Sequence, residues 1–532
     1  MKQKYHHHHV QKKQGGIITM PFIFANEICE KLAVVGFGTN MISYLTSQLH
    51  LPMTKAANTL TNFGGTAAMT PLLGAFIADA FAGRPTCYTL RLALANGLRL
   101  RGPCVVSFGA DQFDENDPEQ KTTTWKFFNW YYFCMGASIL VATTVIVYVQ
   151  DNVGWGWGLG IPTAAMFLSI IAFIFGYPLY RKVDPAGSPF TRLLQVSMAA
   201  YRKRYVPMVS DHKMLYQNED LDAVISVGGK LVHTKSMKFL DKAAIVTEDD
   251  NLKAPNPWKL STVHRVEELK SLIRMGPIWA AGILLITASA QQNTFSLQQA
   301  KSMDRHLTKH FQIPAASMSV FTQTSMLSTI VFYDRLFVPL MRKFTGLERG
   351  ISFLTRMGIG FVISLLATFA AGFIEIKRKH AASAYDLIDH PQATIPISVF
   401  WLMPQYCLHG IAEAFMSIGH LEFFYDQAPE SMRSTATALF WLSISAGSYT
   451  STLLVTLVHK FTAGENGSNW LPDNNLNKGK LEYFYWLITL LQLVNLIYYL
   501  LCAKFYTLKP IQVHQAVDER ENKDEIELTD HV

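Results

Sequence analysis

Three ionisable side chains, Glu27, Glu30 and Lys31, lie near the middle of an otherwise uncharged apolar run, residues 17–45. An apolar stretch of about 20 residues predicts a membrane-spanning helix, and an ionisable group at its centre costs about 2.5 kcal/mol or more. On a helix, Glu27 stands three residues before Glu30 and four before Lys31, so it faces both. The pattern predicts a proton switch. A static salt bridge is the alternative, but charged groups at this depth usually mark ion or substrate pathways.

A second group of polar residues lies in two later apolar runs. Glu413 is in the middle of one run, and His409 stands one helical turn before it on the same face. We expect Glu413 to be functional, whereas for His409 a satisfied core histidine is favoured over a titrating one. Four further side chains, in another run, could hydrogen-bond an anion or an organic acid, or could equally join helices to one another: Ser289, Gln291, Asn293 and Thr294.

The composition is that of a membrane protein. Of 532 residues, 49% are hydrophobic and only 16% are charged, against about 25% charged in soluble domains. We assign the net charge of +7 to loops, where Lys and Arg set membrane orientation, and not to nucleic-acid binding. The six cysteines lack metal spacing and predict neither a disulfide framework nor a metal site. No nucleotide-binding motif is present, so we expect no cofactor and no enzymatic activity.

The apolar runs predict an all-α polytopic fold with ten apparent transmembrane helices. They cover residues 17–45, 57–83, 127–150, 157–181, 272–296, 314–341, 350–376, 397–425, 433–460 and 481–506. We therefore divide the chain into a cytoplasmic tail (1–16), an incomplete N-terminal bundle (17–181), a cytoplasmic loop (182–271), a six-helix bundle (272–506) and a disordered cytoplasmic tail (507–532). The basic loop sets this orientation. The run Lys377, Arg378 and Lys379 falls on the wrong side of this scheme.

Several motifs resemble one family of transporters. Phe424 to Ser434 reads FYDQAPESMRS and resembles the signature of proton-dependent oligopeptide transporters, and Glu27-x-x-Glu30-Lys31 resembles the first-helix motif of that family. FGADQFDE, with Asp111 and Asp114, resembles the loop after the family's fourth helix, and Gly74, Asp79, Gly83 and Arg84 resemble a structural motif of major-facilitator transporters. Together these motifs resemble the plant nitrate transporter/peptide transporter family, most closely its nitrite- and gibberellin-transporting subfamily.

The resemblance implies two six-helix bundles around a cavity that opens alternately to each side, with protons driving the uptake of substrate. It implies that Glu27, Glu30, Lys31 and Glu413 couple the proton to transport. Nitrate-specialised members carry a histidine at the position of Ser289, which argues against that mode of nitrate binding.

This chain departs from the family pattern after Gly83 and Arg84. The family's third helix and most of its fourth are missing, and Gly102 stands where a basic residue is expected before Pro103.

We therefore expect an integral membrane transporter that imports a small anion, nitrite or nitrate, or an organic-acid hormone such as gibberellin. Its partners are a small-molecule substrate, protons and the lipid bilayer, with no nucleic acid; homo- or hetero-oligomerisation is left open. The plasma membrane is the expected location, and the plastid envelope is the alternative. The missing helices motivate a second interpretation, a truncated non-transporting isoform with a regulatory or hetero-oligomeric role, and a third, a faulty gene model.

Overall fold

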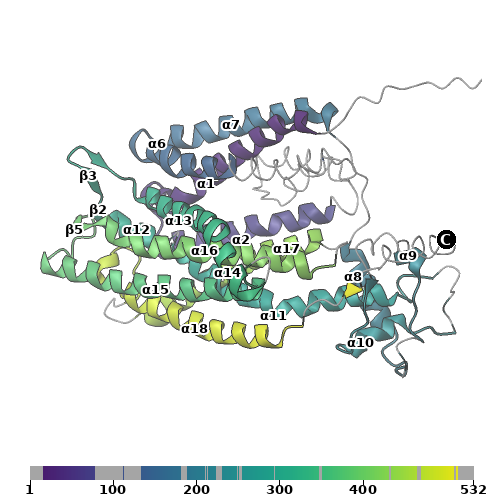
Figure 1. The fold of residues 1–532 in the computed structure, drawn as a ribbon. Coiled ribbons are helices and arrows are strands. Elements are labelled where there is room, and N and C mark those ends of the chain that lie inside the picture. Colours follow the sequence, from purple (N-terminus) through teal and green to yellow (C-terminus); the bar gives the residue numbers. More distant parts are fainter. Residues whose placement is uncertain are drawn as a thin grey trace, which may run out of the picture. The chain divides into compact units, whose positions relative to one another are not determined.

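Helices make up most of the architecture (Figure 1). The computed structural model describes residues 16–77, 112, 134–180, 189–209, 211, 214–222, 230–248, 250, 255–292, 294–346, 350–429, 433–463, 469–507 and 511–512. The chain divides into two compact units: unit 1 holds Met1–Ala186, Ala280–His420 and Phe440–Leu501, and unit 2 holds Gly187–Trp279, Leu421–Leu439 and Cys502–Val532. Each unit is described by itself.

The predicted all-α membrane class is confirmed. In the described part of the chain, six helices are long and apolar enough to cross a membrane. The count of ten spans, the two missing family helices and the predicted domain boundaries stay predictions, because residues 78–111 and 113–133 lie outside the described ranges.

The first helices of unit 1 pack closely against one another. They are η1 (Ile17–Thr19), α1 (Met20–Ser47), α2 (Met53–Ile77), the π-helical turn η3 (Ala142–Ile146), α6 (Val147–Asn152), α7 (Trp155–Gly176) and η4 (Tyr177–Leu179). Gln150 on α6 donates to the carbonyl of Gly36 on α1 at 3.0 Å. A Cβ on Gly158 of α7 would lie 2.2 Å from Cγ of Gln150. Glycine is therefore required at position 158 for α6 and α7 to pack this closely.

The later helices of unit 1 coincide with the six apolar runs predicted after residue 271. These elements are α11 (Val263–Gln292), α12 (Phe295–Ser302), η7 (Ala315–Met318), α13 (Ser319–Phe332), the π-helical turn η8 (Tyr333–Phe337), α14 (Val338–Thr345), α15 (Phe353–Ala384), η9 (Val399–Leu402), α16 (Met403–Gln427), α17 (Arg433–Thr462), η11 (Leu476–Lys478) and α18 (Leu481–Phe505). One end of each of α11, α16, α17 and α18 belongs to unit 2. Four short strands lie between these helices. Strand β2 (Met303–Asp304) pairs in parallel with β5 (Ile395–Ser398), and β3 (His306–Thr308) pairs antiparallel with β4 (Phe311–Gln312). A buried apolar core that includes Phe295, Tyr406 and Phe484 joins these elements.

The structure explains the basic run that contradicted the predicted orientation. Arg378 on α15 is fully buried and donates to both carboxylate oxygens of Glu375, at 2.7 and 2.8 Å. Lys379 pairs with Glu482 at 2.8 Å, and the Lys377 ammonium lies 3.0 Å from the centroid of the Trp401 ring. Each of the three cations therefore has a partner in the protein, although only Arg378 is buried, so they do not act as the free loop charges on which the positive-inside rule depends.

Unit 2 is a small helical unit with its own core. Its elements are α8 (Pro189–Arg202), α9 (Glu219–Asp222), β1 (Lys230–Leu231), α10 (Lys238–Asp241), η6 (Lys242–Ala244) and β6 (Ile511–Gln512). The unit also holds the first part of α11, the end of α16, the start of α17 and the last residues of α18. Strands β1 and β6 pair antiparallel, with Leu231 opposite Ile511. Val196 and Ala199 of α8 pack with Leu240 and Val266, because the apolar residues of α8 recur on one helical face.

Candidate proton and substrate site

The predicted ionisable group on α1 forms a buried pair. Lys31 Nζ lies 2.9 Å from Oε1 of Glu27, whose side chain is 2% exposed, while the Lys31 side chain is 24% exposed. This contact has the distance of an ion pair but not the angles of a hydrogen bond, so charge attraction holds it. Glu30 is buried one turn along the same helix. Because α1 packs against α7, most of whose residues are apolar, the pair lies in surroundings where an unpaired charge would be costly.

The second predicted group brings α11 and α16 together. Ser289 Oγ lies 2.9 Å from Nε2 of His409, so the hydroxyl and the imidazole share one hydrogen bond. Both side chains are only partly buried. Glu413, one turn further along α16, is also partly buried, and no hydrogen-bond or ion-pair partner for its carboxylate lies within the described ranges. Ser289 and His409 can donate hydrogen bonds to an anion, and the nearby Glu413 carboxylate can take up a proton.

Two further predicted cavity residues, Gln291 and Thr294, are hydrogen-bonded to other groups of the protein. Gln291 donates to Ser451 of α17 at 2.7 Å, and its Oε1 is buried without a hydrogen bond. Thr294 bonds back to the carbonyls of Ala290 and Gln291, both at 3.2 Å. The contact of Gln291 with Ser451 is the interhelical kind that was the alternative to substrate binding, whereas Thr294 bonds only to carbonyls of the preceding helix in these contacts.

Most of the predicted motif residues and one predicted cavity residue lie outside the described part of the chain. Gly74 lies in α2, whereas Asn293, Asp79, Gly83, Arg84, Asp111 and Asp114 lie outside the described residues. A buried polar network around Glu375 and Arg378 was not predicted from the sequence. Gln299 of α12 donates to Glu375 at 2.6 Å, and Tyr485 of α18 donates to Gln299 at 3.1 Å. The available signal was an acid and a base three residues apart within an apolar helix.

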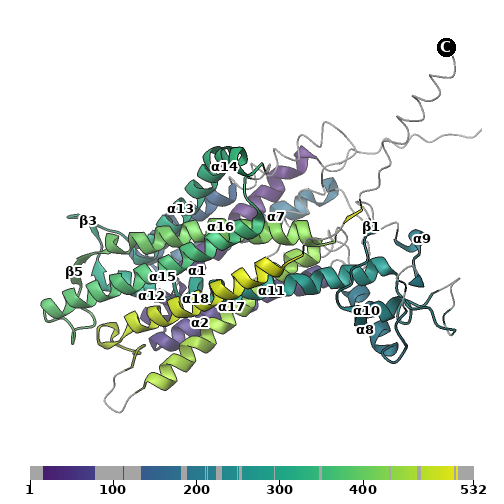
Figure 2. The same cartoon turned by 60° about the horizontal axis from the view of Figure 1, so that its bottom comes forward.

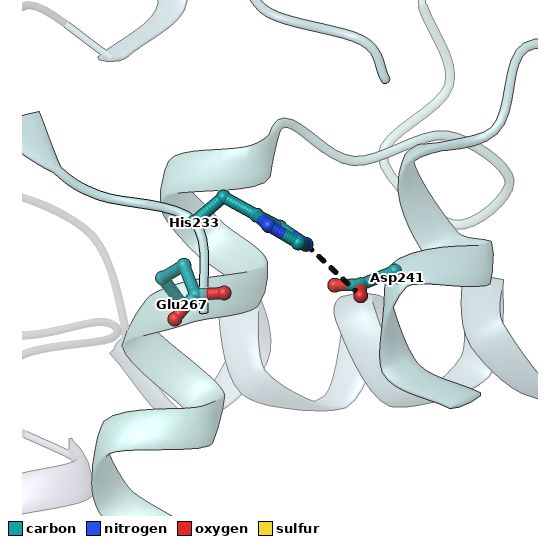
Figure 3. A group of neighbouring side chains, drawn as sticks. All are labelled: His233, Asp241 and Glu267. Carbon is teal, nitrogen blue, oxygen red and sulfur yellow. Dashed lines mark hydrogen bonds and ion pairs between the residues drawn. The ribbon is translucent and has the colours of Figure 1, made fainter. Parts of the chain in front are cut away.

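A cluster in unit 2 has the residue types of a metal site (Figure 3). His233 points toward Asp241, with 3.1 Å between Nε2 and Oδ2, and Glu267 lies beside them on α11. The fully buried Lys270 ammonium lies 2.6 Å from Oδ1 of Asp241 and 2.8 Å from Oε1 of Glu267. Lys270 therefore already supplies a positive charge to both carboxylates, so the cluster is a buried ion-pair network. The network ties α10 and the segment at His233 to the start of α11.

Comparison with known proteins identifies relatives along almost the whole chain. The family model described as PTR2, POT family, matches residues 92–471. The chain is 65% identical to Protein NRT1/PTR FAMILY 3.1 of Arabidopsis thaliana over 578 aligned positions, covering 99% of this chain and 97% of that protein. It is 42% identical to Protein NRT1/PTR FAMILY 8.1 of Arabidopsis thaliana, covering 94% of this chain and 95% of that protein.

The solved structures agree in fold. The crystal structure of an auto inhibited POT family peptide transporter matches with a TM-score of 0.67 at 20% identity, covering 93% of this chain and 99% of that one. The in meso crystal structure of the POT family transporter PepTSo matches with a TM-score of 0.66 at 19% identity, covering 92% and 98%. At these identities the likeness concerns the fold alone.

The alignment with the 65% identical relative is longer than this chain. It spans 578 positions, whereas the chain has 532 residues, so at least 46 aligned positions have no residue here. Two membrane spans need about 40 residues before their connections are counted. The difference in length is therefore large enough to hold the two family helices that we expect to be missing from this chain.

Proposed function

The chain belongs to the POT family of membrane transporters, and we propose that it is a proton-coupled importer of a small anion, nitrite or nitrate, or of an organic-acid hormone such as gibberellin. The observation that carries the proton part is the buried pair of Glu27 and Lys31 on α1, 2.9 Å apart. Protonation of Glu27 would remove its attraction for Lys31 and free the ammonium for another partner. If Lys31 changes its partner when Glu27 is protonated, proton binding is linked to a change in the contacts between helices.

The substrate part of the proposal rests on Ser289, His409 and Glu413. The hydroxyl and the imidazole can donate to an anionic oxygen, whereas an ionised Glu413 would repel it. An anion therefore binds more favourably here when Glu413 holds a proton. This reciprocity between the two ligands is what symport requires. We place the transporter in the plasma membrane, with the plastid envelope as the alternative.

The experiment is uptake into proteoliposomes at external pH 5.5 and 7.5, using nitrite, nitrate and gibberellin as separate substrates. Glu27→Gln should abolish the acid stimulation, because it keeps the side-chain shape but cannot exchange a proton. Glu482→Gln is the matched control, since it removes one partner of another carboxylate–lysine pair, the 2.8 Å pair with Lys379. Acid stimulation that survives Glu27→Gln would remove the proton role of this pair.

The shortfall of aligned positions favours a second candidate, a truncated isoform that does not transport and that regulates or associates with full-length copies. Uptake by this chain should then be absent, and uptake by a co-reconstituted full-length copy should change with the amount of this chain added. Uptake by this chain alone at the rate of the full-length copy would exclude this candidate.

A further inference from the structure

One exposed part of unit 2 combines cations with aromatic rings. The guanidinium carbon of Arg204, which follows the end of α8, lies 4.3 Å from the centroid of the Tyr201 ring and 4.5 Å from that of the Tyr205 ring. Tyr201 is 60% exposed and Tyr205 is 83% exposed. The rings therefore hold the guanidinium at the surface without neutralising its charge.

Three further cations lie around Arg204. Arg202 donates to the Trp258 carbonyl at 3.3 Å, which brings it to the residue before Lys259, and Lys242 donates to the Arg204 carbonyl at 2.5 Å. Within the described ranges, no carboxylate forms an ion pair with any of these four cations. Six residues define this surface, the basic face: Tyr201, Arg202, Arg204, Tyr205, Lys242 and Lys259.

Two carboxylates of the same unit are already engaged with other cations. Asp250 pairs at 2.7 Å with Lys203, the buried lysine between the two arginines of the basic face. Asp241, which precedes Lys242, pairs at 2.6 Å with the buried Lys270. The cations of the basic face therefore still have charge with which to bind an anionic partner.

The C-terminal part of the chain joins the same unit and has the opposite charge. Strand β6 pairs with β1, with Leu231 opposite Ile511. Residues 513–532 follow β6 and contain seven acidic and two basic side chains, a net charge of −5, with all seven acids between Asp518 and Asp530. A segment of this composition has too little apolar surface for a core of its own, so its contacts with another surface must come mainly from its charges.

A short series of contacts leads from β1 to the basic face. His233, which stands two residues after β1, contacts Asp241 at 3.1 Å, and the next residue, Lys242, donates to Arg204. Helices α8 and α10, which carry Arg202 and Asp241, lie side by side in both ribbon views (Figures 1 and 2). An extended chain places the first acid up to about 20 Å, and the last up to about 60 Å, beyond β6. The acids are therefore within reach, and the tether raises their effective concentration to about the millimolar range.

We propose that residues 518–530, the acidic segment, bind the basic face of unit 2. The C-terminal part of the chain is then held at two points, by β6 on β1 and by carboxylates on the four cations. Arg204 uses one N–H group on the Tyr201 carbonyl at 3.2 Å, so its other N–H groups can bind a carboxylate through two parallel hydrogen bonds. The bound segment also covers cations that would otherwise attract anionic lipid headgroups.

Cleavage by trypsin after Arg520 and Lys523 tests the proposal, because both positions lie within the acidic segment. The full chain is purified in dodecyl maltoside without anionic lipid, and the released C-terminal peptides are followed by mass spectrometry. In Arg202→Gln/Arg204→Gln the cleavage should be about tenfold faster, because two charge-assisted contacts are lost. About 1 M salt shortens the Debye length to about 3 Å and should remove the difference between the two proteins.

The matched control removes the same two charges from unit 1. Arg335→Gln/Arg342→Gln replaces two exposed arginines of η8 and α14 and should leave the cleavage rate unchanged. Equal rates in the unsubstituted chain and in Arg202→Gln/Arg204→Gln would overturn the proposal, and so would a control variant that is cleaved as fast as Arg202→Gln/Arg204→Gln.

A reciprocal measurement leaves the basic face unsubstituted. Replacing the seven acids of the acidic segment by their amides should make acylation of Lys259 by a soluble succinimidyl ester several-fold faster, because Lys259 is then no longer covered. Lys478, whose side chain is 55% exposed in unit 1, should react equally in both proteins. If Lys259 reacts equally in both proteins in micelles and is protected only in vesicles that contain phosphatidylglycerol, the bilayer occupies the basic face and the proposal fails. Neither measurement uses a transported substrate, so the result is independent of the proposed function.

Discussion

The buried network around Arg378 should contribute more to stability than the two neighbouring lysines, and this difference can be measured within one three-residue run. Arg378 makes four hydrogen bonds: two to Glu375, one to Ser302 at 3.0 Å and one to Asn477 at 2.7 Å. In Arg378→Met the Glu375 carboxylate stays buried and keeps the amide of Gln299 as its remaining donor among the described residues. Removing one partner of a buried pair costs about 3–5 kcal/mol, a factor of about 100 to 4,000 in the unfolding equilibrium.

The adjacent lysines provide matched controls. The Lys379 side chain is 26% exposed where it pairs with Glu482, so Lys379→Met should cost about 0–1 kcal/mol. Lys377 contacts Trp401 through its ammonium, and Lys377→Met should cost about 0.5–1 kcal/mol. The three variants remove the same charge at consecutive positions of α15. They differ in what the charge contacts.

Equilibrium unfolding in mixed micelles of dodecyl maltoside with a rising fraction of SDS would rank the three variants. Glu375→Leu/Arg378→Met should recover part of the loss of Arg378→Met, because no charge is then left buried. Equal midpoints for Arg378→Met and Lys379→Met would refute the reasoning. A double variant less stable than Arg378→Met alone would show that the hydrogen bonds of Glu375, and not its charge, dominate.

Two further predictions concern packing and pH. Gly158→Ala should destabilise the protein by about 1–3 kcal/mol, because the new Cβ would lie 2.2 Å from Gln150 Cγ. The control Gly160→Ala should be neutral or stabilising, because a Cβ there would have no neighbour within 4 Å. The same unfolding assay checks both variants. In unit 2, burial alone would raise the pKa of Asp250, but the hydrogen bond and charge of Lys203 at 2.7 Å hold that pKa below its ordinary value. The contribution of Asp250 to stability is therefore present above the unfolded carboxyl pKa and is lost as pH falls through the folded pKa. The hydrogen–deuterium exchange protection of residues 189–209, taken as the intrinsic exchange rate divided by the observed rate, should fall between pH 7 and pH 3 more in the unsubstituted chain than in Asp250→Asn. Equal falls in the two proteins would contradict the prediction.

Alternating apolar and polar segments were enough to predict most of the helices. Each of the ten predicted runs contains helix in the part that the structure describes, because about 20 apolar residues in a membrane can satisfy their backbone only as a helix. The family was also predictable, since the motif at Phe424 to Ser434 is specific and the comparisons confirm the assignment.

The sequence alone determined the class of protein, the family and the pair of Glu27 and Lys31, because their spacing of four residues places them together on any helix. Only the tertiary structure decided which residues meet across helices. The bond between Ser289 and His409 joins positions 120 residues apart, and no local pattern predicts it. The same holds for the hydroxyls of Thr61 and Thr452, which lie 2.5 Å apart on α2 and α17, and for Arg378, whose charge predicts a loop but whose neighbours bury it. Helix formation is local, whereas the partners of a buried polar group depend on packing between distant segments.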